Sequence, residues 1–286
     1  MPWPASDLRG DRSTGAKAGI MTTEAPVRTS LLSESLVFAG QQFTHWRRDP
    51  LVPIQALVFP TFLLITYYLL IGKSVLRITG TDSLYGLVPT CAIAGAFSGA
   101  IAVGLTLSFE RDIGLLSRLW VLPVNRASAL TGRLIAEAAR TLLSTALITA
   151  VGIGLGLRFQ GGPLELLLYL LVPVMVVVVF AMAVIALAVR AKDGTVLIWL
   201  GLPAITAVFA SSGSPPVESL PSWMWPLLRF QPMDPIVESM RTLAQGGLPL
   251  WPLFWGVVWT VGLGAIIGPL TIRNYRTAAE SGGVRG

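Results

Sequence analysis

The residues best suited to chemistry lie between 109 and 126, in the stretch FERDIGLLSRLWVLPVNR. Five of its eighteen residues are charged, with both signs present: Glu110, Arg111, Asp112, Arg118 and Arg126. Acids and bases side by side suit complementary charges on another protein, whereas a lipid surface attracts Lys and Arg alone. The stretch therefore predicts a surface that docks a protein partner.

A second charged group follows at residues 133, 137 and 140, at the start of a long apolar run. Arg133, Glu137 and Arg140 are spaced by four and three residues, so they can pair along one face of a helix. Charges inside a membrane are costly and face protein or water. We interpret the three residues as an intramembrane polar anchor and not as a substrate site.

Motifs for catalysis or nucleotide binding are incomplete. Residues 72–74, Gly-Lys-Ser, match the end of a P-loop, but the pattern needs a glycine at the position of Tyr67. The chain has one histidine, His45, and one cysteine, Cys91, which leaves no His/Asp/Glu catalytic cluster and no cysteine-pair metal site. We expect no catalytic residue, metal or cofactor on this chain.

The composition predicts an all-α integral membrane protein. Of the 286 residues 53% are hydrophobic and 13% are charged, about half the charge that soluble domains carry. The formal charge of +6 is not arranged as a basic stripe with exposed aromatics, so nucleic acid is not an expected partner.

Six apolar segments are long enough, or nearly so, to cross a membrane, which needs about 20 apolar residues. They are residues 51–72, 84–108, 134–157, 164–189, 195–211 and 251–270, of which the fifth is short and contains Gly201 and Pro203. Gly95 and Gly99 form a G-x-x-x-G in the second segment, which we expect to serve internal packing more than a dimer face.

Lys and Arg are enriched in the cytoplasmic loops of membrane proteins. With a cytoplasmic N-terminus, the loops on that side hold fifteen basic residues and those on the other side five. We therefore predict a multi-pass protein of the cytoplasmic (inner) membrane with both termini in the cytoplasm. The stretch 109–126 then faces the cytoplasm, and the polar anchor lies near the cytoplasmic end of the third span.

Residues outside the spans divide into tails and amphipathic segments. Residues 1–30 are rich in Pro, Gly, Ser, Thr and charge, so we expect a disordered tail, with Met21 as an alternative start to Met1. We expect residues 31–276 to form one membrane domain and residues 277–286 to form a cytoplasmic tail. The segment 31–50 mixes polar and apolar residues in a way that favours a helix at the membrane surface.

The segment 212–249 is too long for a turn and too apolar for a solvated loop. We expect two short helices that dip into the outer leaflet while buried by protein. The second is predicted over residues 234–245, with Asp234 at the N-cap, Pro235 at the first helical position and Gly246 past the end.

On a helical wheel the stretch from Glu110 is amphipathic. Its apolar half contains Ile113, Leu115, Leu116, Leu119, Trp120 and Leu122, and Pro123 ends it. The other half contains Glu110, Arg111, Gly114, Ser117 and Arg118, and Asp112 alone is out of place. The pattern predicts a helix on the membrane surface with its charged face toward the cytoplasm.

The run ERDIGLLSRLWVLPVNRASALTGRLIAEAARTLL resembles the signature region of type-2 ABC exporter permeases. The likeness is closest to the daunorubicin-resistance branch, with its DrrB and DrrC permeases. Within the run, the segment GLLSRLWVLPVNRAS is especially similar to DrrC-type sequences. The segment PSWMWPLLRFQPMDPIVESMR is similar to the outer region of the same family. The resemblance covers about residues 31–276.

The resemblance implies a coupling helix, which inserts into a cleft of a separate ATP-binding subunit. Carried over by position, this helix runs from Glu110 to Pro123, and residues 31–49 would be a connecting helix that also touches the ATPase. The residues implied in ATPase coupling are Glu110, Arg111, Asp112, Gly114, Leu115, Arg118, Leu119 and Pro123.

The resemblance also implies partners and cargo. ABC ATPase subunits would bind ATP and Mg, and a second permease subunit, homologous or identical, would complete the membrane part. The cargo of this branch is hydrophobic drugs or complex envelope lipids, exported across the membrane.

Two other functions are compatible with a six-span chain. An ATP-independent transporter or channel would need acidic residues within the spans for ion coupling, and the middles of the predicted spans contain none. A membrane-embedded lipid-modifying enzyme would need His, Asp and Glu clusters, which one histidine does not supply. We favour the exporter permease.

Overall fold

The computed structural model describes residues 40, 44, 51–79, 82–113, 126–191, 193–211, 222, 226 and 230–282. This part of the chain is helical and contains no strand. Its helices are α2 (Leu51–Thr79), α3 (Leu84–Asp112), α5 (Arg126–Leu155), α6 (Pro163–Ala188), α7 (Thr195–Phe209), α9 (Asp234–Ala244) and α10 (Leu250–Gly282). The N-terminal tail and nearly all of the predicted surface helix at 31–50 lie outside the described residues.

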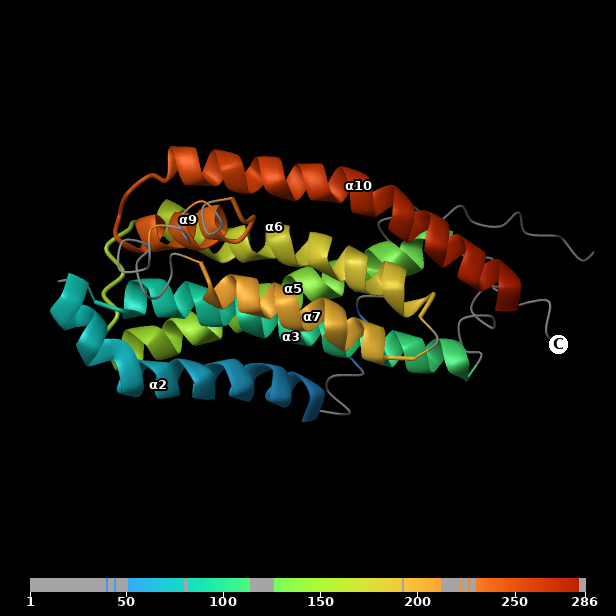
Figure 1. The fold of residues 1–286 in the computed structure, drawn as a ribbon, viewed down its shortest axis with the longest axis horizontal. Coiled ribbons are helices and arrows are strands. Elements are labelled where there is room, and N and C mark those ends of the chain that lie inside the picture. Colours follow the sequence, from blue (N-terminus) through green and yellow to red (C-terminus); the bar gives the residue numbers. More distant parts are fainter. Residues whose placement is uncertain are drawn as a thin grey trace, which may run out of the picture.

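Apart from α9, the helices lie side by side and alternate in direction, so that the bundle has two ends (Figure 1). At one end, called here the Asp112 end, α3 finishes, α5 begins and α6 turns into α7. At the opposite end, the α9 end, the short helix α9 lies beside α6 and α10. All six segments that were predicted as spans are therefore helical, and each runs opposite to its neighbour in the chain.

Four of these helices are long and apolar enough to cross a membrane, counted over the described residues. They are α3, α6 and the portions Leu130–Leu155 of α5 and Leu250–Tyr275 of α10. The 15 residues of α7 span about 22 Å at 1.5 Å per residue, less than the hydrocarbon core of about 30 Å. Helix α2 has 29 residues, and Pro60–Leu70 is its apolar stretch when only the described residues are counted. Membrane crossing by α2 and α7 therefore stays a prediction.

Helix α3 is the centre of the bundle and contacts α2, α5, α6, α7 and α9. Glycines allow these close approaches: a Cβ built on Gly95 would lie 2.3 Å from Pro60 Cγ, and one on Gly104 would lie 2.3 Å from Val184 Cγ1. Phe97 stacks on Phe180 of α6, with ring centroids 4.1 Å apart. The two glycines of the G-x-x-x-G are Gly95 and Gly99. Both pack against other helices of this chain, Gly95 against Pro60 and Gly99 against Arg140, as predicted.

Helix α9 is amphipathic and closes the bundle at its own end. Ile236, Val237, Met240 and Leu243 are buried against α3, α6 and α10. Gly246, at φ +79°, ends the helix, and Gly247 N donates to the carbonyl of Thr242 at 2.9 Å, a Schellman cap. The predicted helix exists, although Asp234 is its first helical residue and not the N-cap.

Two helices extend past the predicted span ends. The second segment does not stop at Ser108, because no Gly or Pro interrupts the backbone hydrogen bonds before Gly114, and α3 continues to Asp112. Helix α10 likewise continues beyond residue 270 to Gly282. The first of the two predicted outer-leaflet helices falls largely outside the described residues.

Candidate functional site

The charged residues at the start of the predicted docking stretch occupy the last turn of α3. Glu110 and Arg111 are half-buried, while Asp112 is exposed. Ile113 N still donates to the carbonyl of Phe109 at 3.1 Å, so the helical hydrogen-bond pattern continues through this turn. The predicted coupling stretch therefore starts from an ordered helix end.

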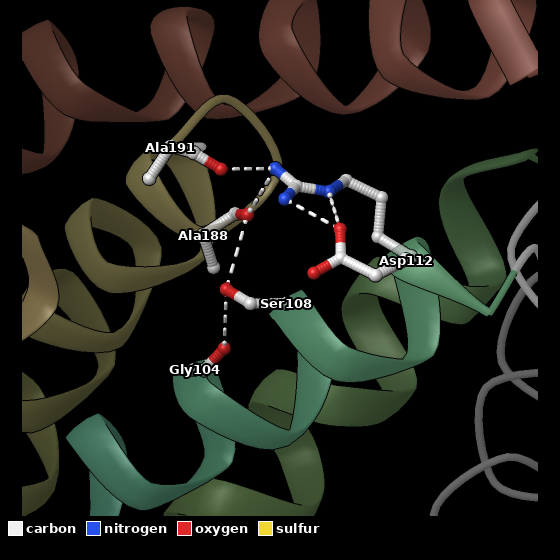
Figure 2. Close-up of polar contacts among 6 residues, drawn as sticks. Gly104, Ser108, Asp112, Ala188 and Ala191 are labelled. Carbon is white, nitrogen blue, oxygen red and sulfur yellow. Dashed lines mark hydrogen bonds and ion pairs between the residues drawn. The ribbon is translucent and has the colours of Figure 1, made fainter. Parts of the chain in front are cut away.

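Arg111 ties this helix end to α6. Its Nη1 donates to the carbonyls of Ala188, at 3.1 Å, and of Ala191, while Nε and Nη2 donate to Asp112 Oδ1 at 3.0 and 2.7 Å (Figure 2). Ser108 Oγ lies 3.2 Å from the same Ala188 carbonyl. A cation at a helix C-terminus also complements the negative end of the helix dipole.

The last carbonyls of α6 are all accounted for, which a helix end in a membrane protein requires. The carbonyls of Ile185 and Leu187 accept bonds from the following turn. Ala186 O accepts from Asn274 Nδ2 of α10 at 3.2 Å, and Ala188 O accepts from α3. Side chains from two other helices thus complete the end of α6.

Glu110 ties α3 to α5 through an ion pair with Arg133. Tyr275 of α10 is buried beside them and interacts electrostatically with both charges. We call Ser108, Glu110, Arg111 and Arg133 the α3 clamp. The clamp joins the last turn of α3 to the end of α6 and to the first turns of α5.

A second ion pair, Glu137 with Arg140, is buried inside the bundle. Arg140 Nε donates to Glu137 Oε2 at 3.0 Å, and Nη2 donates to Glu137 and to Ala96 O of α3 at 2.8 Å. The guanidinium lies against Gly99, where an added Cβ would be 2.0 Å from Nη1. The glycine of α3 therefore provides the space for this arginine.

This pair lies in the middle of the bundle. Arg140 is the fifteenth of the 30 residues of α5, and its contacts Ala96 and Gly99 lie near the middle of α3. Of the three predicted anchor residues, Glu137 and Arg140 form an ion pair with each other, whereas Arg133 forms its ion pair with Glu110.

Five of the residues implied in coupling, Gly114, Leu115, Arg118, Leu119 and Pro123, lie outside the described residues. The structure adds contributors that the sequence reading missed: Ser108, Asn274 and Tyr275. Asn274 and Tyr275 follow the last apolar run, where a boundary drawn by hydropathy ends the span. The only sequence signal for them is the absence of Gly and Pro between residues 271 and 280, which allows the helix to continue.

Comparison with known proteins settles the family. The model of the ABC-2 type transporter family matches residues 35–244. The chain belongs to the ABC-2 type transporter family. The probable doxorubicin resistance ABC transporter permease protein DrrC of Mycobacterium tuberculosis is 34% identical over 249 residues, covering 87% of this chain and 90% of the relative.

More distant relatives of this ABC-2 chain are also permeases by name. The daunorubicin resistance ABC transporter permease protein DrrB1 of Streptomyces coeruleorubidus is 25% identical over 258 residues, or 88% of this chain and 89% of the relative. A putative transport permease, ycf38 of Cyanophora paradoxa, is 25% identical over 218 residues, 74% of each chain. The predicted resemblance to the daunorubicin-resistance branch is confirmed.

Proposed function

We propose that this chain is the membrane subunit of an ATP-driven exporter for hydrophobic drugs or complex envelope lipids. Separate ATPase subunits would bind ATP and Mg, and a second permease subunit, homologous or identical, would complete the pathway. The chain would be a six-span protein of the cytoplasmic membrane with both termini and the Asp112 end in the cytoplasm. The match to the ABC-2 family over residues 35–244 carries this proposal.

The α3 clamp supplies a physical route for coupling. A force on residues 114–125 acts on the end of α3 and on the start of α5, between which Glu110 and Arg133 are paired. Arg111 passes the same displacement to the end of α6. Because the three helices are joined at one end, they would move together when the ATPase pulls on the stretch.

The surface of the bundle suits a membrane subunit for apolar cargo. Large apolar side chains on the outward faces of α2, α7 and α10 are exposed in the single chain, including Leu69, Trp199 and Val261. Lipid, a second permease subunit or cargo would cover them.

The ion-coupled alternative receives less support. Among the described residues of the candidate spans, Glu137 is the acid that lies away from a helix end, and it is paired with Arg140. Both carboxylate oxygens of Glu137 accept hydrogen bonds from Arg140, which supports a structural role for this acid.

The test combines partner association with a charge swap. We expect a P-loop ATPase to co-purify with the full-length chain from its native host, and Arg118→Glu to weaken that association. Arg77→Glu, at the opposite end of the bundle, is the matched control and should leave association intact. Absence of any associated ATPase would contradict the proposal.

The role of the clamp is tested separately. Glu110→Arg places two arginines together and should reduce transport-linked ATP hydrolysis, while Glu110→Arg combined with Arg133→Glu should restore it. Restoration by the swap would show that Glu110 acts inside the bundle. Loss of ATPase association in both variants would instead place Glu110 in the docking contact and remove the clamp from the coupling route.

A further inference from the structure

Helix α5 carries a row of polar side chains on the side that is buried inside the bundle, where α5 packs against α2, α3 and α6. We call it the α5 polar row and define it by five residues that are each less than a tenth exposed: Arg140, Thr141, Ser144, Thr145 and Thr149. Neighbours in the row are one, three or four residues apart, so their side chains follow one another along one side of the helix. The row starts in the middle of α5 and runs toward the α9 end.

Three hydroxyls of the row have an unusual orientation. Ser and Thr within a helix commonly donate to the carbonyl four residues earlier, as Thr90 and Ser98 of α3 do at 2.8 and 2.9 Å. Thr141, Ser144 and Thr145 do not, and among the described residues their buried hydroxyls have no hydrogen-bond partner. These hydroxyls therefore turn away from their own backbone, toward the interior of the bundle.

Donors without a partner also lie at both ends of the row. Arg140 uses Nε and Nη2 to donate to Glu137 and to Ala96 O, but its Nη1 is buried and has no partner among the described residues. At the other end, Tyr169 of α6 is fully buried and lies close to Thr149, and its hydroxyl has no partner in the described part of the chain either. A polar group that is buried without a hydrogen bond destabilises a fold. Five such groups along one row therefore indicate a ligand that forms hydrogen bonds with them.

The spacing of the row suits single water molecules. Side chains four residues apart on a helix are about 5–6 Å from each other, and a water molecule that makes two hydrogen bonds of about 2.8 Å spans such a distance. One water therefore fits each pair of the row that is four residues apart: Arg140 with Ser144, Thr141 with Thr145, and Thr145 with Thr149. Thr149 already donates to the carbonyl of Thr145 at 2.7 Å, so its oxygen remains as an acceptor. Each pair supplies two of the two to four polar partners that a buried water needs.

Burial and charge limit what the ligand is. No residue of the row is more than 7% exposed, so the ligand must be small. An ion would need an unbalanced opposite charge, but Glu137 already neutralises Arg140, and the other groups of the row are uncharged hydroxyls. A hydroxyl both donates and accepts, which matches a small neutral molecule that does the same. Water has these properties and commonly bridges buried polar groups in proteins.

We propose that the α5 polar row binds a file of water molecules inside the bundle, from Nη1 of Arg140 to the hydroxyl of Tyr169. The waters supply the hydrogen bonds that the surrounding helices do not, and they link α5 to α6. Lipid tails cannot supply such bonds at this depth. The inference goes beyond the proposed function and depends on neither an ATPase nor a cargo, so its failure and the failure of the export proposal are separate results.

X-ray footprinting of the full-length chain in phosphatidylglycerol nanodiscs tests the site, because radicals formed from bound water oxidise the side chains that touch it. Tyr169 and Phe97 are both fully buried, but Phe97 stacks on Phe180 and is not part of the row. After correction for the intrinsic reactivity of the two side chains, we expect Tyr169 to be oxidised severalfold faster than Phe97. Thr145→Val combined with Thr149→Val should lower the rate at Tyr169 severalfold. Equal corrected rates at Tyr169 and Phe97 in the unmodified chain would overturn the proposal.

Thermal unfolding of two matched variants gives an independent test. Thr145→Val replaces a hydroxyl by a methyl group of similar size, which leaves the bridging waters without one partner, and should lower the Tm by roughly 2–4 °C. Thr90→Val is the control, because Thr90 is equally buried and its hydroxyl bonds to the carbonyl of Gly86 in its own helix, so its Tm should change little. A dry hydroxyl at position 145 would make valine neutral or stabilising. A Thr145→Val chain as stable as Thr90→Val would therefore overturn the proposal.

Discussion

At the scale of single residues, the notable choice is an arginine placed halfway through an apolar bundle. Arg140 is tolerable there because Glu137 neutralises it, Ala96 O accepts from it and Gly99 makes room for it. Glu137 belongs to α5, whereas Ala96 and Gly99 belong to successive turns of α3. The anchor is therefore a joint property of α3 and α5.

Gly99→Ala tests the room that the arginine needs. The new Cβ would lie 2.0 Å from Arg140 Nη1, and overpacking of this kind costs about 1–3 kcal/mol. Gly262→Ala is the control, because nothing lies within 4 Å of its Cβ position in α10, and alanine in an open helical position stabilises by about 0.5–1 kcal/mol. Thermal unfolding in detergent, followed by tryptophan fluorescence, should show shifts of opposite sign.

A double-mutant comparison tests the ion pair itself. Arg140→Met leaves the carboxylate of Glu137 buried without its partner, which costs about 3–5 kcal/mol. Replacing both residues, as Glu137→Met with Arg140→Met, should recover much of that loss, since no uncompensated charge remains. A double variant no more stable than Arg140→Met would contradict a simple anchoring role.

At the scale of elements, the end of α6 depends on its neighbours. Its final carbonyls are satisfied by Asn274 from α10 and by Ser108 and Arg111 from α3. Helix ends in soluble proteins use water or local caps for this purpose. Here the cap is tertiary, so the position of α6 is fixed by the two helices that hold it.

Asn274→Leu should therefore destabilise the bundle. It leaves the buried carbonyl of Ala186 without its side-chain donor, at a cost of about 1–3 kcal/mol. Thr277→Ala, on the same helix, removes only an exposed bond to the carbonyl of Arg273 and should have little effect. Hydrogen exchange of the last turn of α6 would show the loss locally, and equal protection in both variants would contradict this view of the cap.

At the scale of the whole molecule, the apolar helices of the bundle hold the Asp112 end and the α9 end apart. The turn at Asp193 lies at the Asp112 end, and Leu248 lies at the α9 end beyond α9. If the proposed orientation is right, the first faces the cytoplasm and the second the outside.

Labelling with a membrane-impermeant maleimide in intact cells tests that orientation. Leu248→Cys should react directly, because Leu248 is 65% exposed, whereas Asp193→Cys should react only after the membrane is opened. The native Cys91 is fully buried, so the unmodified chain should give a low background. Reaction of both cysteines from the same side would contradict the proposed topology.

The sequence by itself determined the membrane class, the six apolar helices, the α9 helix and the family. These follow from local information: apolar length, helix punctuation such as Pro235 and Gly246, and a distinctive motif. Helices α3 and α10 continue past the ends of the predicted spans, because hydropathy falls where charged residues begin while a helix continues until a residue breaks it.

Only the tertiary structure decided the partners of the charges. Arg133 has Glu137 four residues away in its own helix, yet it pairs with Glu110, because α3 and α5 bring that carboxylate closer. The contact of Arg140 with Gly99 and the capping of α6 by side chains of α3 and α10 likewise join residues far apart in the chain. Spacing along one helix cannot report these contacts, since they depend on which helices become neighbours.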